Sequence, residues 1–209
     1  MVFSSTVFLF LFLPAFLTIY YICPPKLRNT ILFLASLIFY AWEEPIYIFI
    51  MLFSTIFDYA NGLLIEKSKS NAAKRLILIL SVIGNLSILC FFKYSDFFIT
   101  NVNFVCNTNI SLLKLILPVG ISFYTFQTMS YTIDVYRKKV SAQKNIINFA
   151  AYVTMFPQLV AGPIVRYKTI AKQLDKRQET ISGFVYGIRR FIIGLFKKVM
   201  IANNIGLLW

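Results

Sequence analysis

The sequence predicts an all-α, polytopic membrane protein: a helical bundle with a re-entrant or broken segment and an amphipathic helix at the membrane interface. Hydrophobic residues make up 58% of the chain and charged residues 14%, which is outside the usual range of a soluble domain. Several apolar runs are close to the ~20 residues that a helix needs to cross ~30 Å of hydrocarbon. Lys and Arg outnumber Asp and Glu by 21 to 8. These cations lie mainly between the runs, where they indicate orientation and attraction to anionic lipid rather than nucleic-acid binding.

The first four apolar runs predict membrane spans. They cover residues 2–23, 30–42, 46–65 and 76–92. Two prolines end the first run, and Lys26 and Arg28 follow them. The positive-inside rule places this loop, and the cationic residues 66–75, in the cytoplasm. Residues 93–111 mix Asn, Asp and aromatic side chains, and we expect them to form an outer loop that partly lies on the interface.

Asp58 is an ionisable residue inside the third run. A carboxylate at the centre of a membrane helix costs about 2.5 kcal/mol or more, so it should face protein or water. Asp58 lies two turns from the cationic end of the run. Two interpretations are therefore open: a carboxylate near the interface that caps a helix or pairs with a Lys, and a functional group.

The fifth apolar run, residues 112–135, is the most polar of the candidate spans. Pro118 and Gly120 predict a break near its start. After the break, polar side chains recur at intervals of three, four and three, so they share one helical face. They are Tyr124, Gln127, Tyr131 and Asp134. This face either lines a polar cavity or forms hydrogen bonds between packed spans.

The next apolar run, residues 146–163, has cations on both sides. A single crossing cannot place both of its ends in the cytoplasm, whereas a segment that enters the membrane and returns can. Proline and glycine breaks favour the same interpretation, because an interrupted helix needs shielding from lipid. A proline-kinked span is the alternative. The residues expected in a re-entrant wall are Pro157, Gln158, Gly162, Pro163 and Arg166.

Residues 183–202 predict an amphipathic helix at an anionic cytoplasmic surface. Arg189, Arg190, Lys197 and Lys198 cover one half of its circumference and apolar side chains cover the other. A span with snorkelling ends is the weaker alternative, because the cations lie in the middle of the segment.

Some chemistry can be excluded from the residue types present. The chain contains no histidine, and Ser122 lacks both a base and the second glycine of a nucleophile elbow, so a serine hydrolase is rejected. The three cysteines are too few and too scattered for a disulfide framework or a metal site.

Four motifs in order resemble the membrane-bound O-acyltransferase (MBOAT) family, in its alginate O-acetyltransferase branch. They are LPVGISFYTFQ at 117–127, YTIDVYR at 131–137, FPQLVAGPIVRY at 156–167 and GLFKKVMIA at 194–202. The resemblance implies that residues 1–209 are the N-terminal part of a single MBOAT-like transmembrane domain whose C-terminal part is absent. It also implies a helical bundle around a funnel, with the re-entrant wall near the acyl path.

The resemblance implies transfer of an acyl (acetyl) group from a cytoplasmic thioester donor, an acyl-CoA or an acyl carrier, to hydroxyls of an extracytoplasmic polysaccharide. The family's catalytic histidine belongs to the missing part, so no catalytic residue is assigned here and the chain alone is expected to be inactive. The expected setting is the lipid bilayer of a bacterial inner membrane, with acyl-transfer or export-complex proteins as partners. A non-catalytic scaffold of a polysaccharide export complex and a transporter subunit are the alternative functions.

Overall fold

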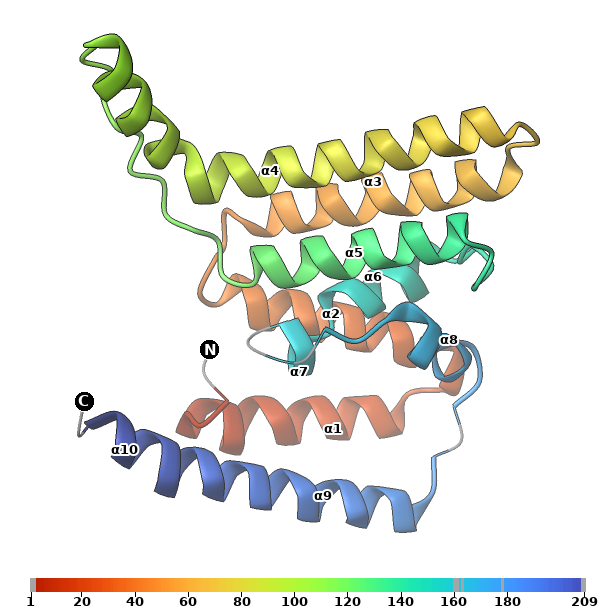
Figure 1. Cartoon of the computed structure of the whole chain (residues 1–209). Helices are drawn as coiled ribbons and strands as arrows, with labels where there is room; N and C mark the ends of the chain where they lie inside the picture. Colours follow the sequence, from red (N-terminus) through yellow and green to blue (C-terminus); the bar gives the residue numbers. More distant parts are fainter. Residues whose placement is uncertain (1–2, 160–161, 163, 178, 208–209) are drawn as a thin grey trace. The chain divides into compact units, whose positions relative to one another are not determined.

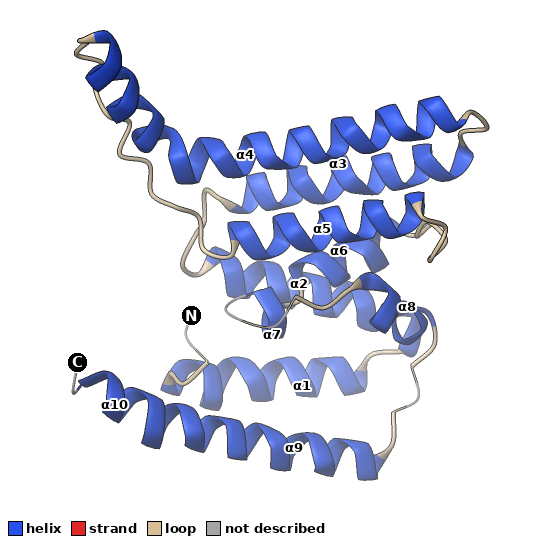
Figure 2. Cartoon of the chain, viewed as in Figure 1, coloured by secondary structure: helices blue, strands red, loops and turns tan. Residues whose placement is uncertain are grey.

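A computed structural model describes residues 3–159, 162, 164–177 and 179–207. These residues form helices joined by loops, with no strand among them (Figures 1 and 2). The all-α prediction is therefore confirmed. The chain divides into two compact units, a larger one of residues Asn29–Leu174 and a smaller one of Met1–Arg28 with Asp175–Trp209.

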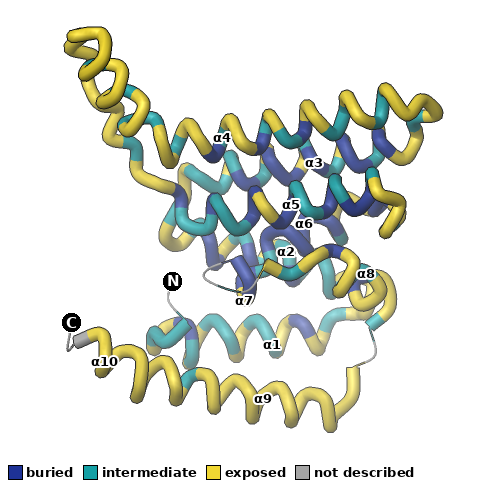
Figure 3. Tube along the Cα trace, in the orientation of Figure 1, coloured by how far each residue is buried: buried dark blue, intermediate teal, exposed yellow. Residues whose placement is uncertain are grey.

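The larger unit is a bundle built around α3, α4 and α5, which all pack against one another, while α6 packs on α3 and α5 (Figure 1). Its helices are α2 (Arg28–Ala41), α3 (Ile48–Lys67), α4 (Asn71–Cys106), α5 (Ile121–Tyr136), α6 (Ile146–Thr154), α7 (Phe156–Leu159) and α8 (Tyr167–Asp175). Buried residues concentrate on α5, α6 and the facing side of α3 (Figure 3).

Within the described residues, α3 and α4 are the two helices that are long and apolar enough to cross a membrane. Helix α3 covers the third predicted span from Ile48 onward, and α4 contains the whole of the fourth. Most of the apolar surface of α4 is exposed, as expected for a helix that faces lipid.

The expectation of an outer loop at residues 93–111 is wrong for most of its length, because α4 continues to Cys106. The stretch from Lys93 to Cys106 contains neither proline nor glycine. Its polar side chains bond back to the helix: Thr100 Oγ1 donates to the Asp96 carbonyl at 2.7 Å and Asn101 Nδ2 donates to the Phe97 carbonyl at 2.7 Å. Polar residues are thereby accommodated in a helix. Figure 1 shows that these last turns bend away from the rest of α4.

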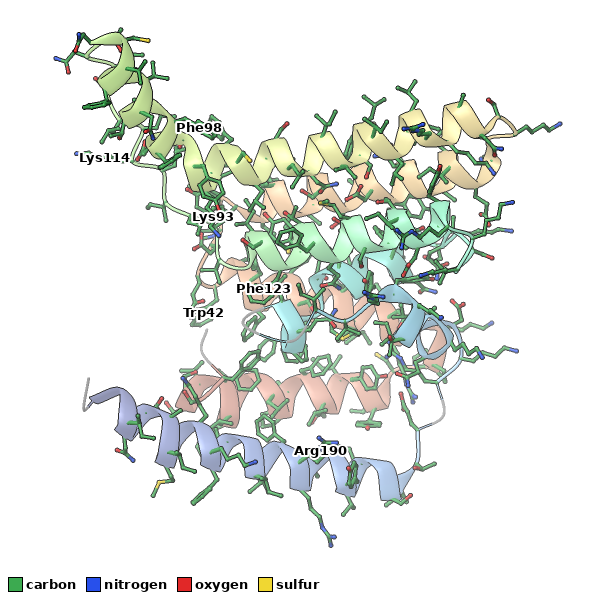
Figure 4. The ribbon with its side chains drawn as sticks, viewed as in Figure 1. Trp42, Lys93, Phe98, Lys114, Phe123 and Arg190 are labelled. Carbon is green, nitrogen blue, oxygen red and sulfur yellow. The ribbon has the colours of Figure 1, made fainter. Side chains whose placement is uncertain are left out.

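The chain returns from α4 to α5 without regular structure. Asp96 accepts hydrogen bonds from the backbone N–H groups of Leu113, at 2.8 Å, and Lys114, at 3.1 Å. Figure 4 shows Lys93, Phe98 and Lys114 at this end of the larger unit. The predicted break at the start of the fifth run is confirmed, since α5 begins directly after Gly120, whose φ is +78°. A Cβ at that position would lie 2.9 Å from the Leu159 carbonyl oxygen, so the turn requires glycine.

The smaller unit holds the two ends of the chain. Its N-terminal part is a π-helical turn, η1 (Phe8–Phe12), that continues into α1 (Leu13–Ile22) and is followed by the 3-10 turn η2 (Pro25–Leu27). Its C-terminal part comprises α9 (Ile181–Phe196), the π-helical η3 (Lys197–Ala202) and α10 (Asn203–Leu207). Helix α9 is exposed along almost its whole length (Figure 3). The predicted amphipathic segment is thus helical, and its place at the membrane interface stays a prediction.

Candidate functional site

The proline-rich segment after α6 is broken in the structure, as the sequence predicts. Helix α6 ends at Thr154, Met155 leaves the helical region with φ −47° and ψ 108°, and α7 has only the four residues Phe156–Leu159. Pro157 has no backbone N–H to donate, so it cannot extend α6. That the segment re-enters the membrane stays a prediction.

The break frees the carbonyl of Tyr152, and two side-chain amides bind it. In an uninterrupted helix the Phe156 N–H would donate to this oxygen. Instead it donates to Ser36 Oγ of α2 at 3.2 Å. The Tyr152 carbonyl accepts from Gln127 Nε2 of α5 at 2.8 Å and from Gln158 Nε2 of α7 at 2.6 Å. We call Gln127 and Gln158 the amide pair.

The amide pair joins the two sets of residues singled out from the sequence, because Gln127 belongs to the polar face of α5 and Gln158 to the expected wall. Both side chains are buried. In the low dielectric of a protein interior, an unpaired carbonyl is costly and a paired one is strongly held. The amide pair therefore fixes where the broken helix lies against α5.

The remaining members of the polar face are also buried. Tyr131 Oη accepts a hydrogen bond from the backbone N–H of Gln143 at 3.0 Å, and Gln143 Nε2 donates to Tyr167 Oη at 3.0 Å. Asp134 accepts at its carbonyl from the Lys139 N–H at 2.9 Å. No hydrogen-bond partner is found for the buried Tyr124 Oη among the described residues.

An aromatic cluster, not anticipated from the sequence, surrounds Tyr131. Its ring centroid lies 4.5 Å from that of Phe149 and 5.1 Å from that of Tyr167. Tyr152 completes the cluster, 5.3 Å from Tyr167. Edge-to-face and tilted pairs at these distances are favourable beyond the area they bury. The cluster fixes α6 and α8 against α5 directly beside the break.

The remaining wall residues do not join the amide pair. Pro157 and Arg166 are exposed and Gly162 is partly buried, while Pro163 lies outside the described residues. Among the wall residues that the structure describes, Gln158 is therefore the one with a buried polar contact.

Asp58 is fully buried, and its partners are neutral side chains rather than a lysine. Ser81 Oγ donates to Asp58 Oδ1 at 2.7 Å, and Asn85 Nδ2 donates to Asp58 Oδ2 at 2.8 Å. Ser81 also lies 3.3 Å from Thr132 Oγ1 of α5. Ser81 and Asn85 are one helical turn apart on α4, a spacing that would have singled them out as a polar face. The result is a buried polar contact that joins α3, α4 and α5.

A cavity of about 340 Å³ lies at the cationic end of the larger unit. Glu66 and Lys74 line it from α3 and α4, and Lys138, Lys139 and Ser141 line it from the turn after α5. We call this cavity the lysine pocket. Its three ammonium groups against one carboxylate suit an anionic ligand. Within the described ranges, no group of His, Cys, Asp and Glu side chains is arranged to hold a metal ion.

Residues 30–205 match the model of the membrane-bound O-acyltransferase family, MBOAT. The chain is 43% identical to a probable alginate O-acetylase AlgI of Pseudomonas aeruginosa, over 100% of this chain and 41% of that protein. It is 41% identical to the AlgI of Azotobacter vinelandii, over 98% of this chain and 42% of that protein.

A relative that is named for a different polymer also matches. The chain is 37% identical to a peptidoglycan O-acetyltransferase of Helicobacter pylori, over 98% of this chain and 45% of that protein. No solved structure matches the chain significantly. The chain spans about two-fifths of the length of these curated relatives. Since the family model covers most of the sequence, the chain belongs to the membrane-bound O-acyltransferase family.

Proposed function

We propose that the protein containing these residues transfers an acetyl group from a cytoplasmic thioester donor to hydroxyl groups of a polysaccharide outside the membrane. The observation that supports the proposal is the identity of about 40% along the whole chain to proteins named for O-acetylation. The relatives are named for different polymers, alginate in two cases and peptidoglycan in the third. The proposal therefore names the acceptor class, a polysaccharide hydroxyl, and not the polymer.

In this proposal residues 1–209 supply the scaffold and the entry for the donor. Acceptor hydroxyls need a general base, and the family resemblance assigns that task to a histidine, which this sequence does not contain. The base therefore lies outside these residues. Asp58 is a poor substitute, because both of its carboxylate oxygens already accept hydrogen bonds.

The lysine pocket is the proposed entry for the donor. It lies at the end of the bundle that the positive-inside rule assigns to the cytoplasm, and its ammonium groups would attract the phosphates of an acyl-CoA or an acyl carrier. The amide pair and Arg166 are proposed to shape the acyl path beyond it. The proposed location is the inner membrane of a bacterium, with the bilayer, the polysaccharide and export-complex proteins as partners.

Deletion of the gene tests the proposal. The polysaccharide of the deletion strain should lose its O-acetyl groups, measured by proton NMR of the purified polymer. Restoration should require coding sequence for the catalytic histidine in addition to residues 1–209. O-acetylation restored by residues 1–209 alone would contradict the assignment of the base, and O-acetylation unchanged by the deletion would contradict the enzyme and favour the scaffold alternative.

A pair of variants tests the donor entry in the active protein. Lys138→Gln with Lys139→Gln should raise the KM for the thioester donor about tenfold, because charge-assisted contacts to phosphate are lost. The matched control is Lys93→Gln with Lys114→Gln, which removes two charges at the other end of the larger unit (Figure 4). An equal rise in KM for both pairs would show that overall charge, and not the lysine pocket, attracts the donor.

A further inference from the structure

The smaller unit contains a hollow between α1 and α9. A cavity of about 460 Å³ is lined by side chains of both helices, mostly apolar. Leu13 and Leu17 come from α1, and Phe184, Ile188 and Phe191 come from α9. The volume lies within the ~300–1,000 Å³ typical of small-molecule sites. The lining residues on α9 run from Gly183 to Phe191, which suits an extended apolar ligand.

A polar cluster lies at one end of this cavity. Arg28 forms an ion pair with Glu179, Tyr20 Oη donates to Glu179 Oε1 at 2.7 Å, and Arg177 Nη1 donates to Tyr20 Oη at 2.5 Å. A second cavity of about 830 Å³ is lined by Arg28, Arg177 and Glu179. It shares Tyr21 and Phe184, among other residues, with the first, so the apolar cavity opens directly onto the cationic cluster.

The cluster presents two guanidinium groups to the second cavity. Arg28 and Arg177 both line it, together with the Glu179 carboxylate. Each guanidinium has five N–H donors in a planar fork. Arg28 Nε is shielded from solvent and has no acceptor among the described residues. A buried donor without a partner is costly, and an anionic ligand oxygen would relieve this cost.

We propose that this pair of cavities binds one anionic phospholipid, with an acyl chain between α1 and α9 and the phosphate at Arg28 and Arg177. Arginine is the side chain best suited to phosphate, because its fork matches the oxygen geometry. Arg28 and Arg177 belong to the cationic segments that the sequence assigns to the cytoplasmic side, where the leaflet is rich in anionic lipid. The proposal goes beyond acetyl transfer and does not depend on it.

The first experiment uses the unaltered protein purified in detergent. Native mass spectrometry measures lipid binding during titration with phosphatidylglycerol or with phosphatidylcholine of identical acyl chains. Phosphatidylglycerol should bind about tenfold more tightly, because the zwitterionic choline headgroup competes for its own phosphate. Free glycerol phosphate should compete only weakly, since it lacks the chain. Equal affinity for both lipids, or displacement by glycerol phosphate at the same concentration as the lipid, overturns the proposal.

Two variants then separate the contribution of the lipid's acyl chain to binding from that of its headgroup. Gly187 lines the apolar cavity, and a Cβ added to it meets nothing within 4 Å, so Gly187→Leu places an additional apolar side chain at the cavity wall. Gly194→Leu is the matched control, because a Cβ there also meets nothing and Gly194 lines neither cavity. Gly187→Leu should weaken phosphatidylglycerol binding about tenfold, while Gly194→Leu should leave it unchanged.

The headgroup variant is Arg177→Gln, which should abolish the preference for phosphatidylglycerol. Its control is Arg190→Gln on α9 (Figure 4), where the guanidinium likewise contacts a tyrosine: Nη1 donates to Tyr186 Oη at 3.2 Å. If both variants lose the preference equally, non-specific charge explains it and the site is wrong. Unchanged lipid binding in Gly187→Leu, with altered stability, would mean that protein fills the cavity, which also overturns the proposal.

Discussion

Removing the amide pair tests the most specific contact in the larger unit. Gln127→Leu and Gln158→Leu each remove one of the two donors to the Tyr152 carbonyl and keep a similar side-chain volume. A single neutral hydrogen bond contributes about 0.5–1.5 kcal/mol, and such bonds in membrane helices average about 0.6 kcal/mol. Each single variant should therefore lower the free energy of unfolding by about 1 kcal/mol or less.

The double variant should lower the free energy of unfolding by more than the sum of the two single variants. It leaves the buried Tyr152 carbonyl without a side-chain donor, which adds a desolvation cost of about 1–3 kcal/mol. We expect a coupling energy of about 1 kcal/mol in a double-mutant cycle. The assay is unfolding of the purified protein in mixed micelles of mild detergent and SDS, followed by far-UV circular dichroism.

The control for this cycle is Asn101→Leu, which removes an amide donor to a helix carbonyl at 2.7 Å in an exposed position. It should change stability by less than about 0.5 kcal/mol. The reasoning is refuted if the two Gln variants are additive within experimental error. It is also refuted if the double variant is no more destabilised than Asn101→Leu.

Three further predictions follow from single positions. Asp58→Ala should lower the free energy of unfolding by about 2 kcal/mol in the same assay, because two buried donors lose their acceptor; a neutral result would contradict the buried contact. Gly62→Ala should lower the free energy of unfolding by about 1–3 kcal/mol, since a Cβ would lie 2.6 Å from Tyr131 Cε1. The control is Gly194→Ala, whose Cβ meets no neighbour and which should raise the free energy of unfolding by about 0.5–1 kcal/mol. Cys106, exposed at the end of α4, should react with a membrane-impermeant maleimide in intact spheroplasts; labelling only after lysis would reverse the predicted orientation of α4.

Features that depend on the local backbone were predictable. The break at Pro157 and the start of α5 after Gly120 follow from a missing N–H group and from a positive φ, which are properties of single residues. The shared face of Gln127 and Tyr131 follows from helical periodicity alone. The sequence also contains the family motifs, and the comparisons confirm the family.

The end of α4 was predicted wrongly, for an identifiable reason. The polar residues after Lys93 predict a loop. However, Thr and Asn can return their side-chain hydrogen bonds to the carbonyl one turn earlier, so a polar stretch without proline or glycine remains helical. The segment between α4 and α5 is held by a hydrogen bond from the Leu113 backbone N–H to the Asp96 carboxylate, and these residues are 17 positions apart. No local sequence pattern predicts such a contact.

The sequence was sufficient to predict that the chain is helical and membrane-bound, that its helices are interrupted at Gly120 and Pro157, and that Gln127 and Tyr131 share a face. These properties are set by composition, periodicity and the chemistry of proline and glycine. Which groups meet depends on the tertiary structure: Asp58 contacts Ser81 and Asn85, and two side-chain amides bind the Tyr152 carbonyl. A freed carbonyl or a buried carboxylate requires a partner, but the partner's identity depends on how helices distant in sequence pack together.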